Sequence, residues 1–287
     1  MKDIDVPEIV WTSIGSLEVV AILDGKVANA PEEAAPGVDV AEVRRDYPEL
    51  FDEEGVWRGP VTCYLVRTEI GWVLLDSGIG PRRWSGWPRG SLDTGLAAVG
   101  IAPSEIVAVV MSHLHDDHVG WNTVPGPDGS PVLYFENAAF YTTPDEWAYW
   151  TSPELLARED HAYLHDCVEP LRSADLRLVA PDHQIAPGVR LYPLPGHTPG
   201  HSGVRLESDG VVATLLGDST HYLAQIDHPE WSPTWDVEPE LAAQTRRRVF
   251  EDAAADPSQL LIGGHWAFPG IGRLRRTEEG IVYEPVV

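Results

Sequence analysis

Short apolar runs rich in β-branched residues recur along the chain, and most of them end in small and polar residues. One run spans residues 106–111 (Ile-Val-Ala-Val-Val-Met) and follows the turn-forming Ala-Pro-Ser at 102–104. Runs of this length, bounded by turn residues, are typical of buried β-strands. We therefore predict strands at 106–111 and at the similar runs 14–23, 61–66, 191–195, 211–216 and 260–262.

Three other stretches predict helices. They run from Pro144 or Asp145 to Trp150, from Pro153 to Arg172, and from Pro239 to Ala255. Each has proline at or beside its first turn, where the fixed φ and the missing N–H are tolerated. The run Arg246-Arg247-Arg248 in the third predicts a solvent-exposed face that pairs with acidic residues.

Residues 24–60 are rich in Pro, Glu and Asp and show little periodicity. We predict one short helix there, at 40–45. The segment is either an insertion that covers a functional site or a solvent-exposed loop, and the sequence favours neither.

The polar cluster that follows the strand at 106–111 carries the most specific chemistry in the chain. It reads His113-x-His115-x-Asp117-His118. Imidazole and carboxylate ligands gathered at the end of one strand suit zinc and neighbouring divalent ions. A solvated loop would explain one or two such residues but not this density.

Three later strands end in the same way. They lead into Gly196-His197, Gly217-Asp218 and Gly264-His265. Glycine before each of these side chains lets the backbone turn sharply and approach closely without a Cβ clash. Four strand ends with metal-capable side chains are a far more specific signal than any one of them.

These motifs together resemble the metallo-β-lactamase superfamily over nearly the whole chain, with Val73-Leu74-Leu75-Asp76-Ser77-Gly78 matching its strand and D-[ST]-G turn. The resemblance implies one domain over residues 1–287 with an α/β fold, the four-layer αββα sandwich. It also implies two divalent metal ions, zinc being the expected metal, with Asp218 bridging them. The first ion would be held by His113, His115 and His197, and the second by Asp117, His118 and His265.

The segments after Asp218 and His265 are similar to the branch that holds quorum-quenching lactonases and methyl parathion hydrolase-like enzymes. One position departs from the better-known acyl-homoserine lactonases, because His221 stands where they carry a tyrosine. We expect His221 either to donate a hydrogen bond to the developing oxyanion or to orient Asp218. Asp117 and His221 are therefore the candidate catalytic residues. Asp76 is expected to orient a ligand, and His201 is left out of the ligand set.

Composition narrows the class of substrate and partner. With 45 acidic and 20 basic residues, the net charge of −25 opposes binding to nucleic acids and anionic membranes. The two cysteines, Cys63 and Cys167, give neither a disulfide framework nor a Cys-x-x-Cys zinc site. An N-terminus without an apolar segment predicts a soluble, cytoplasmic protein. A homodimer remains open.

The ligand inventory predicts hydrolysis by a hydroxide that bridges the two metals, since the sequence offers no serine or cysteine nucleophile in a suitable context. Aromatic residues next to ligands suggest an apolar substrate pocket, and we expect Trp121, Trp266 and Phe268 to line it. The predicted function is a lactonase or esterase acting on a small apolar substrate. An organophosphate triester hydrolase, a thioesterase of glyoxalase II type and a non-catalytic metal-binding or redox-sensing module are the alternatives.

Overall fold

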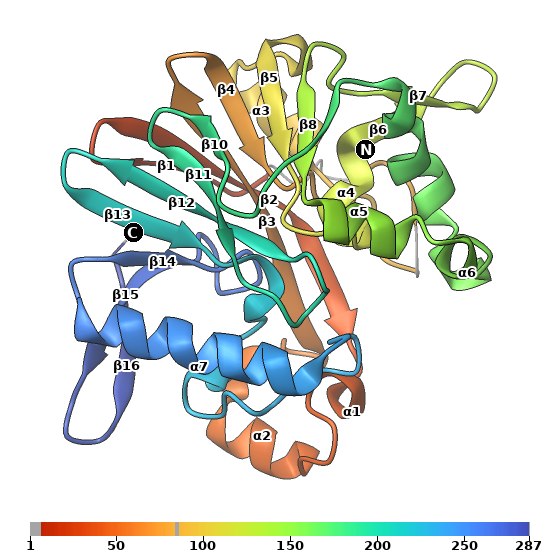
Figure 1. Ribbon diagram of the computed structural model, residues 1–287. Coiled ribbons are helices and arrows are strands. Elements are labelled where there is room, and N and C mark those ends of the chain that lie inside the picture. Colours follow the sequence, from red (N-terminus) through yellow and green to blue (C-terminus); the bar gives the residue numbers. More distant parts are fainter. Residues whose placement is uncertain (1–6, 84–85, 287) are drawn as a thin grey trace.

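Two seven-stranded sheets face each other in the computed structural model, which describes residues 7–83 and 86–286 (Figure 1). The first sheet has the order β1-β2-β3-β4-β5-β8-β9, and the second runs β10 to β16 in sequence order. In the first sheet, β4, β5, β8 and β9 pair in parallel. In the second sheet, β13 and β14 form the one parallel pair among the described residues. The first sheet comprises β1 (Ile9–Ile14), β2 (Leu17–Asn29), β3 (Trp57–Thr68), β4 (Gly71–Leu75), β5 (Ile106–Val110), β8 (Ala139–Thr142) and β9 (Leu176–Leu178).

The second sheet accounts for most of the C-terminal half, and a two-stranded ribbon, β6 with β7, stands apart from both sheets. Its strands are β10 (Gln184–Ala186), β11 (Val189–Pro193), β12 (Ser202–Ser208), β13 (Val211–Leu215), β14 (Leu260–Ile262), β15 (Ile271–Arg276) and β16 (Ile281–Pro285). The ribbon consists of β6 (Thr123–Pro125) and β7 (Pro131–Leu133).

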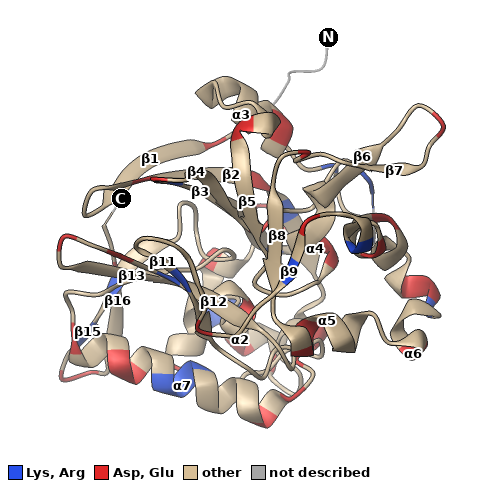
Figure 2. Ribbon diagram, turned by 45° about the horizontal axis from the view of Figure 1, so that its top comes forward, with Lys and Arg blue, Asp and Glu red and all other residues tan. Residues whose placement is uncertain are grey.

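Helices α3 and α5 pack on the outer face of the first sheet, and α7 crosses the outer face of the second sheet in Figures 1 and 2. The helices are α1 (Pro31–Ala34), α2 (Val40–Asp46), α3 (Leu92–Val99), α4 (Asp116–Val119), α5 (Pro144–Trp150), α6 (Pro153–Leu156) and α7 (Pro239–Ala255). No helix in the described part of the chain is long and apolar enough to cross a membrane.

Alternate residues of the central strands pack into different apolar layers, which explains why these strands read as continuous apolar runs. In β2, Val19 and Ala21 face the layer between the two sheets, whereas Val20 and Ile22 face the layer under the helices of the first sheet. A third layer joins α7 to the second sheet through Val249 and neighbouring side chains. The order helix, sheet, sheet, helix confirms the predicted αββα sandwich.

The predicted helix from Pro153 to Arg172 is wrong. α6 ends at Leu156, and short 3-10 and π turns follow up to Ser173. Pro170 lies within this stretch, and a proline in a helix interior removes a hydrogen bond and clashes with the preceding turn. The helices predicted at 40–45 and at Pro239–Ala255 are confirmed, the latter with the same bounds.

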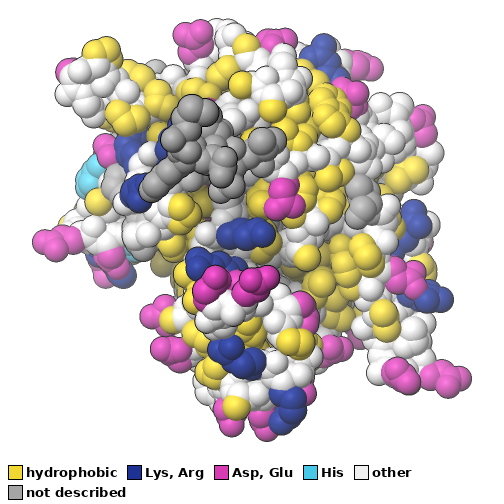
Figure 3. All heavy atoms as spheres, turned by 180° about the vertical axis from the view of Figure 1, so that it is seen from behind, with side chains coloured by type: hydrophobic (Ala, Val, Ile, Leu, Met, Phe, Trp, Pro, Cys, Tyr) yellow, Lys and Arg dark blue, Asp and Glu magenta, His cyan; other side chains and the backbone are white. Residues whose placement is uncertain are grey.

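Acidic residues far outnumber basic ones, and they are spread over the whole molecule. Figure 2 shows acidic residues on elements all around the molecule. In the view of Figure 3, basic side chains form small separate groups among acidic and apolar ones. The surface seen there offers no broad basic face of the kind that binds a phosphate backbone.

Candidate metal centre

Loops at the ends of β5, β11, β13 and β14 bring the seven sequence-predicted ligands to one point between the sheets. The histidine-rich segment leaves β5 and enters the short helix α4, which carries Asp117 and His118. The other three side chains follow strands of the second sheet directly. The site therefore forms only when the two sheets pack in the correct relative position. The residues fall into two groups, His113, His115, His197 with Asp218, and Asp117, His118 with His265.

Three ring nitrogens converge in the first group. Nδ1 of His115 lies 2.8 Å from Nε2 of His113 and 2.9 Å from Nε2 of His197. The Nε2 atoms of His113 and His197 are 3.2 Å apart. Asp218 Oδ2 approaches these two atoms at 3.8 and 3.5 Å. Three nitrogens and one oxygen so arranged match the ligand types of a zinc site.

The second group forms on the other side of Asp218. The Nε2 atoms of His118 and His265 are 3.2 Å apart, and Asp117 lies 3.6 Å from each of them. Asp218 Oδ1 is 3.1 Å from His118 Nε2 and 3.0 Å from His265 Nε2. One oxygen of Asp218 thus faces each group, which is the position required of a bridging ligand.

In three of the histidines, Nε2 points into the centre, whereas Nδ1, on the side of the ring away from the centre, faces an oxygen that accepts a hydrogen bond. A carboxylate or carbonyl oxygen can only accept, so each remote Nδ1 carries a proton. In a neutral ring Nε2 then points a lone pair into the centre, so the converging rings repel one another unless positive charge, a proton or a metal ion, lies between them. The remote bonds are His118 to Asp76 (2.9 Å), His197 to Asp236 (2.9 Å) and His265 to the carbonyl of Pro60 (2.7 Å).

The electrostatics of the centre also favour a cation. Burial raises and the surrounding histidines lower the pKa of Asp218, and the net result lies well below its usual value. Burial lowers the pKa of His118 and His265, but the attraction of Asp218 prevails, raising the pKa of His265 to about 9. Asp218 Oδ1 is buried and accepts no hydrogen bond. The donor set and this orphaned oxygen fit a pair of divalent metal ions.

His201 and Asp76 lie where the sequence reasoning expected. His201 donates from Nδ1 to the carbonyl of Leu194 (2.8 Å) and accepts at Nε2 from the backbone N–H of Asp218 (2.9 Å). Both nitrogens are occupied, so this ring has none left for a metal. Asp76 accepts from Ser112 as well as from His118, at 2.7 and 2.8 Å from the backbone and hydroxyl of Ser112.

Arg246 contradicts the prediction of a solvent-exposed arginine run. Its side chain is buried and donates to Asp236 (3.2 Å) and to the carbonyls of Ser219 and Pro229. Its neighbours Arg247 and Arg248 do lie at the surface. Asp236 therefore links α7 to the ligand His197, and the sequence carried no motif that would have revealed this pair.

A cavity of about 480 Å³ opens over the centre, with His115, Asp117, Asp218 and His265 in its wall. Part of the wall comes from the segment 24–60, including Val27, Ala30, Ala34, Leu50 and Trp57, and part from more distant residues. The other aromatic residues lining it are Trp87, His221, Tyr222 and Trp235.

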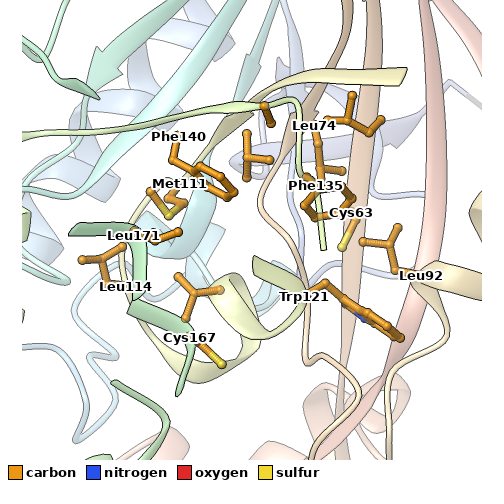
Figure 4. Packing of buried hydrophobic residues seen from close by; sticks show 14 of the residues in the cluster. Cys63, Leu74, Leu92, Met111, Leu114, Trp121, Phe135, Phe140, Cys167 and Leu171 are labelled. Atoms are coloured by element: carbon orange, nitrogen blue, oxygen red, sulfur yellow. The ribbon is translucent and has the colours of Figure 1, made fainter. Parts of the chain in front are cut away.

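The predicted pocket residues Trp121, Trp266 and Phe268 are not in this wall. Trp121 is buried beside Leu92 and Cys63 (Figure 4), and its indole N–H donates to Asp24. Trp266 packs against Tyr283 under α7, and Phe268 packs against the layer between the sheets. Adjacency to a ligand in the sequence failed as a guide because the side chains point into the core.

His221 lines the cavity and touches the centre. Its Nε2 lies 3.1 Å from Asp218 Oδ2 and accepts from the indole N–H of Trp235 (3.0 Å), while its buried Nδ1 has no partner. Burial lowers the pKa of His221, so the ring is neutral near pH 7.

Comparisons with known proteins agree with this geometry. The family model of the metallo-β-lactamase superfamily matches residues 56–265. The N-acyl homoserine lactonase AiiA of Bacillus thuringiensis subsp. kurstaki is 28% identical over 221 residues, which cover 71% of this chain and 80% of that protein.

Two solved structures share the whole fold. The hydrolase AbOPH superposes with a TM-score of 0.82 at 26% identity, covering 97% of both chains. AidC, a dizinc quorum-quenching lactonase, superposes with a TM-score of 0.82 at 21% identity, covering 99% of both chains. At the latter identity the likeness speaks for the fold alone.

Proposed function

The chain belongs to the metallo-β-lactamase superfamily and is a metal-dependent hydrolase, and we propose that it opens lactones that carry an apolar substituent. The observation that carries the proposal is the centre itself. Two ligand groups lie on either side of Asp218, and both face a cavity whose wall includes several apolar side chains.

In this proposal His113, His115 and His197 hold one ion, Asp117, His118 and His265 hold the other, and Asp218 binds both. Zinc suits this set of nitrogen and carboxylate ligands without thiolate. When bound, such a pair lowers the pKa of a water molecule towards neutrality and polarises a carbonyl oxygen. The protein's part is to fix the ligands and to exclude bulk water from the cavity.

The cavity wall would hold the apolar substituent of the substrate and direct its ester group towards Asp218. Trp57, Trp87 and Leu50 lie in this wall, and Trp87 is the most exposed of the three. His221 and Trp235 would contact the polar end of the substrate. A substrate oxygen that displaced the bond between Trp235 and His221 would accept from the indole N–H, and it would accept from His221 as well once that ring took its Nε2–H tautomer.

Charge around the cavity supports a neutral substrate over an anionic one. Apart from the proposed metal ligands, Glu33 lines it, and the one arginine among the described residues of the wall, Arg58, is paired with Asp52 at 2.7 Å. A glutathione thioester carries carboxylates that would meet this negative charge without a free cation. The lactonase relative and the absence of such a cation among the lining residues favour a lactone. A phosphotriester, also neutral, is the second candidate because the same pair of metal ions would polarise its P=O group.

The test is a metal analysis of the purified protein together with a panel of substrates. The panel holds an acyl-homoserine lactone, an aryl ester, a phosphotriester and S-lactoylglutathione. We expect two metal ions per chain and the highest kcat/KM with the lactone, and Asp218→Ala should abolish both. Faster turnover of the phosphotriester would reassign the substrate, and a single bound ion with full activity would overturn the dinuclear centre.

A further inference from the structure

Glu146, on the first turn of α5, is a fully buried acid that the metal chemistry does not use. Its side chain accepts three hydrogen bonds, from the backbone N–H of Leu114 (3.0 Å), the hydroxyl of Thr198 (2.6 Å) and the backbone N–H of Gly200 (3.2 Å). A carboxylate is costly to bury unless donors surround it, so the three donors explain why it is tolerated.

The three donors belong to the loops that carry the first ligand group. Leu114 lies between His113 and His115, and Thr198 directly follows His197. One loop leaves the first sheet and the other leaves the second. Glu146 therefore joins, through a single carboxylate, the two segments that must meet for three histidine nitrogens to converge.

Contacts around Glu146 reinforce this junction. The hydroxyl of Thr143, which caps α5, donates to the carbonyl of Gly200 at 2.9 Å. A Cβ on Gly200 would lie 2.2 Å from the backbone nitrogen of Glu146. This close approach requires glycine, so the first turn of α5 packs directly against the backbone of the loop after His197.

His115 has the greatest need of such support. Within the described residues its Nε2 has no hydrogen-bond partner, unlike the remote nitrogens of His118, His197 and His265. The orientation of His115 depends on its backbone, which Glu146 holds through the N–H of the preceding residue, Leu114. It also depends on Trp150 of α5, whose ring lies 4.8 Å from the imidazole at an interplanar angle of 71°.

We propose that Glu146 is a positioning residue for the His113–His115–His197 half of the metal centre, so that metal affinity at this half depends on its carboxylate. The proposal rests on the proposed dinuclear function and deepens it. The other half is oriented by Asp76 and the carbonyl of Pro60, which Glu146 does not touch. The two halves should therefore respond differently to its loss.

The experiment compares Glu146→Gln with Asp24→Asn as a matched control. Asp24 is equally buried and accepts from the backbone N–H groups of Ile79 and Leu92 (2.6 Å each) and from Trp121 (3.0 Å), but it bonds to neither loop of the three-histidine half. Each metal-free protein is titrated with cobalt(II) against a chelator, and the visible absorption of the bound ion reports its ligand set.

We expect Glu146→Gln to weaken one of the two binding steps by about 10–100-fold, the usual cost of losing an orienting partner, and to change the spectrum of that ion. Asp24→Asn should lower Tm but leave both binding steps intact. Equal affinities in wild type and Glu146→Gln, or an identical loss in Asp24→Asn, would overturn the proposal.

Thr198→Val provides a second variant in case Glu146→Gln does not fold. It removes the 2.6 Å bond and keeps the carboxylate, and it should weaken the same step by a smaller factor; an unchanged step would count against Glu146. A wild-type chain that binds fewer than two ions would overturn the dinuclear function and this inference together. Two ions without lactone turnover would overturn the substrate assignment alone.

Discussion

Replacing Asp236 by alanine should separate two kinds of support that one carboxylate gives. Its Oδ1 accepts from Nδ1 of His197 at 2.9 Å, and its Oδ2 accepts from Arg246 at 3.2 Å. The variant leaves the guanidinium of Arg246, 1% exposed, without a counter-charge. Breaking a buried pair on one side costs about 3–5 kcal/mol, against a total stability of about 5–15 kcal/mol for an ordinary domain.

The same variant removes the acceptor that fixes the ring of His197. Loss of such a partner weakens metal binding by about 10–100-fold. Urea denaturation of the metal-free protein measures the first effect, and competition with a chelator measures the second. Arg247→Ala is the adjacent control, because Arg247 pairs with Glu230 at 3.7 Å with both side chains more than half exposed. Such a pair contributes about 0–1 kcal/mol.

A double variant distinguishes the charge from the orientation. Asp236→Ala with Arg246→Met removes the unpaired cation, so part of the lost stability should return. The carbonyls of Ser219 and Pro229 then lose a donor, so the recovery should be incomplete. Metal affinity should stay low, since His197 still lacks its acceptor. Asp236→Ala within 1 kcal/mol of wild type, or restored metal affinity in the double variant, would refute this reasoning.

Three further predictions concern other parts of the molecule. His221→Ala should lower kcat by about 10²–10³ with both metals retained if the ring contacts the developing oxyanion; restoration of the rate by excess metal would instead assign it to metal retention. Gly217→Ala should destabilise the fold and the centre, measured by Tm and metal content, because φ is +50° and the new Cβ would lie 2.5 Å from Nε2 of His201; Gly129→Ala, also at positive φ but with no neighbour within 4 Å, controls for backbone strain alone. Burial raises the pKa of Asp24 to about 6, so its folded form holds a proton more tightly than the unfolded form, and its contribution to stability is lost as pH rises from about 4 through 6. Between pH 4.5 and 7 this loss amounts to about 2 kcal/mol, which should be missing in Asp24→Asn when urea denaturation is compared at these two pH values. An identical pH dependence in both proteins would contradict it.

The sequence predicted which side chains would lie together at the proposed centre because each follows a strand end, where local pattern and chemistry coincide. The strand predicted at 260–262 and the helix at Pro239–Ala255 have the bounds that the structure gives them. The interruption after Leu156 was missed because helical propensity alone does not show where a helix-prone stretch breaks into short 3-10 and π turns.

The pocket was mispredicted for a geometric reason. Trp121 and Trp266 are close to ligands in sequence, but successive residues in tight turns point in different directions, and both indoles enter apolar layers. The cavity takes its aromatic wall from Trp57, Trp87 and Trp235. These residues come from three separate segments, which only the folded chain brings together.

The acids that support the ligand loops, Glu146 and Asp236, could not be predicted from the sequence pattern for a related reason. Neither belongs to a metal motif: Glu146 acts from helix α5, and Asp236 is held by Arg246 of helix α7. Glu146 reaches the ligand loops from α5, outside the first sheet, and Arg246 reaches them through Asp236 from α7, outside the second. The helices α5 and α7 thus do more than cover the sheets. Each sends one buried charged group inward to the three-histidine half, so displacement of either helix would be felt first as a loss of metal affinity at that half.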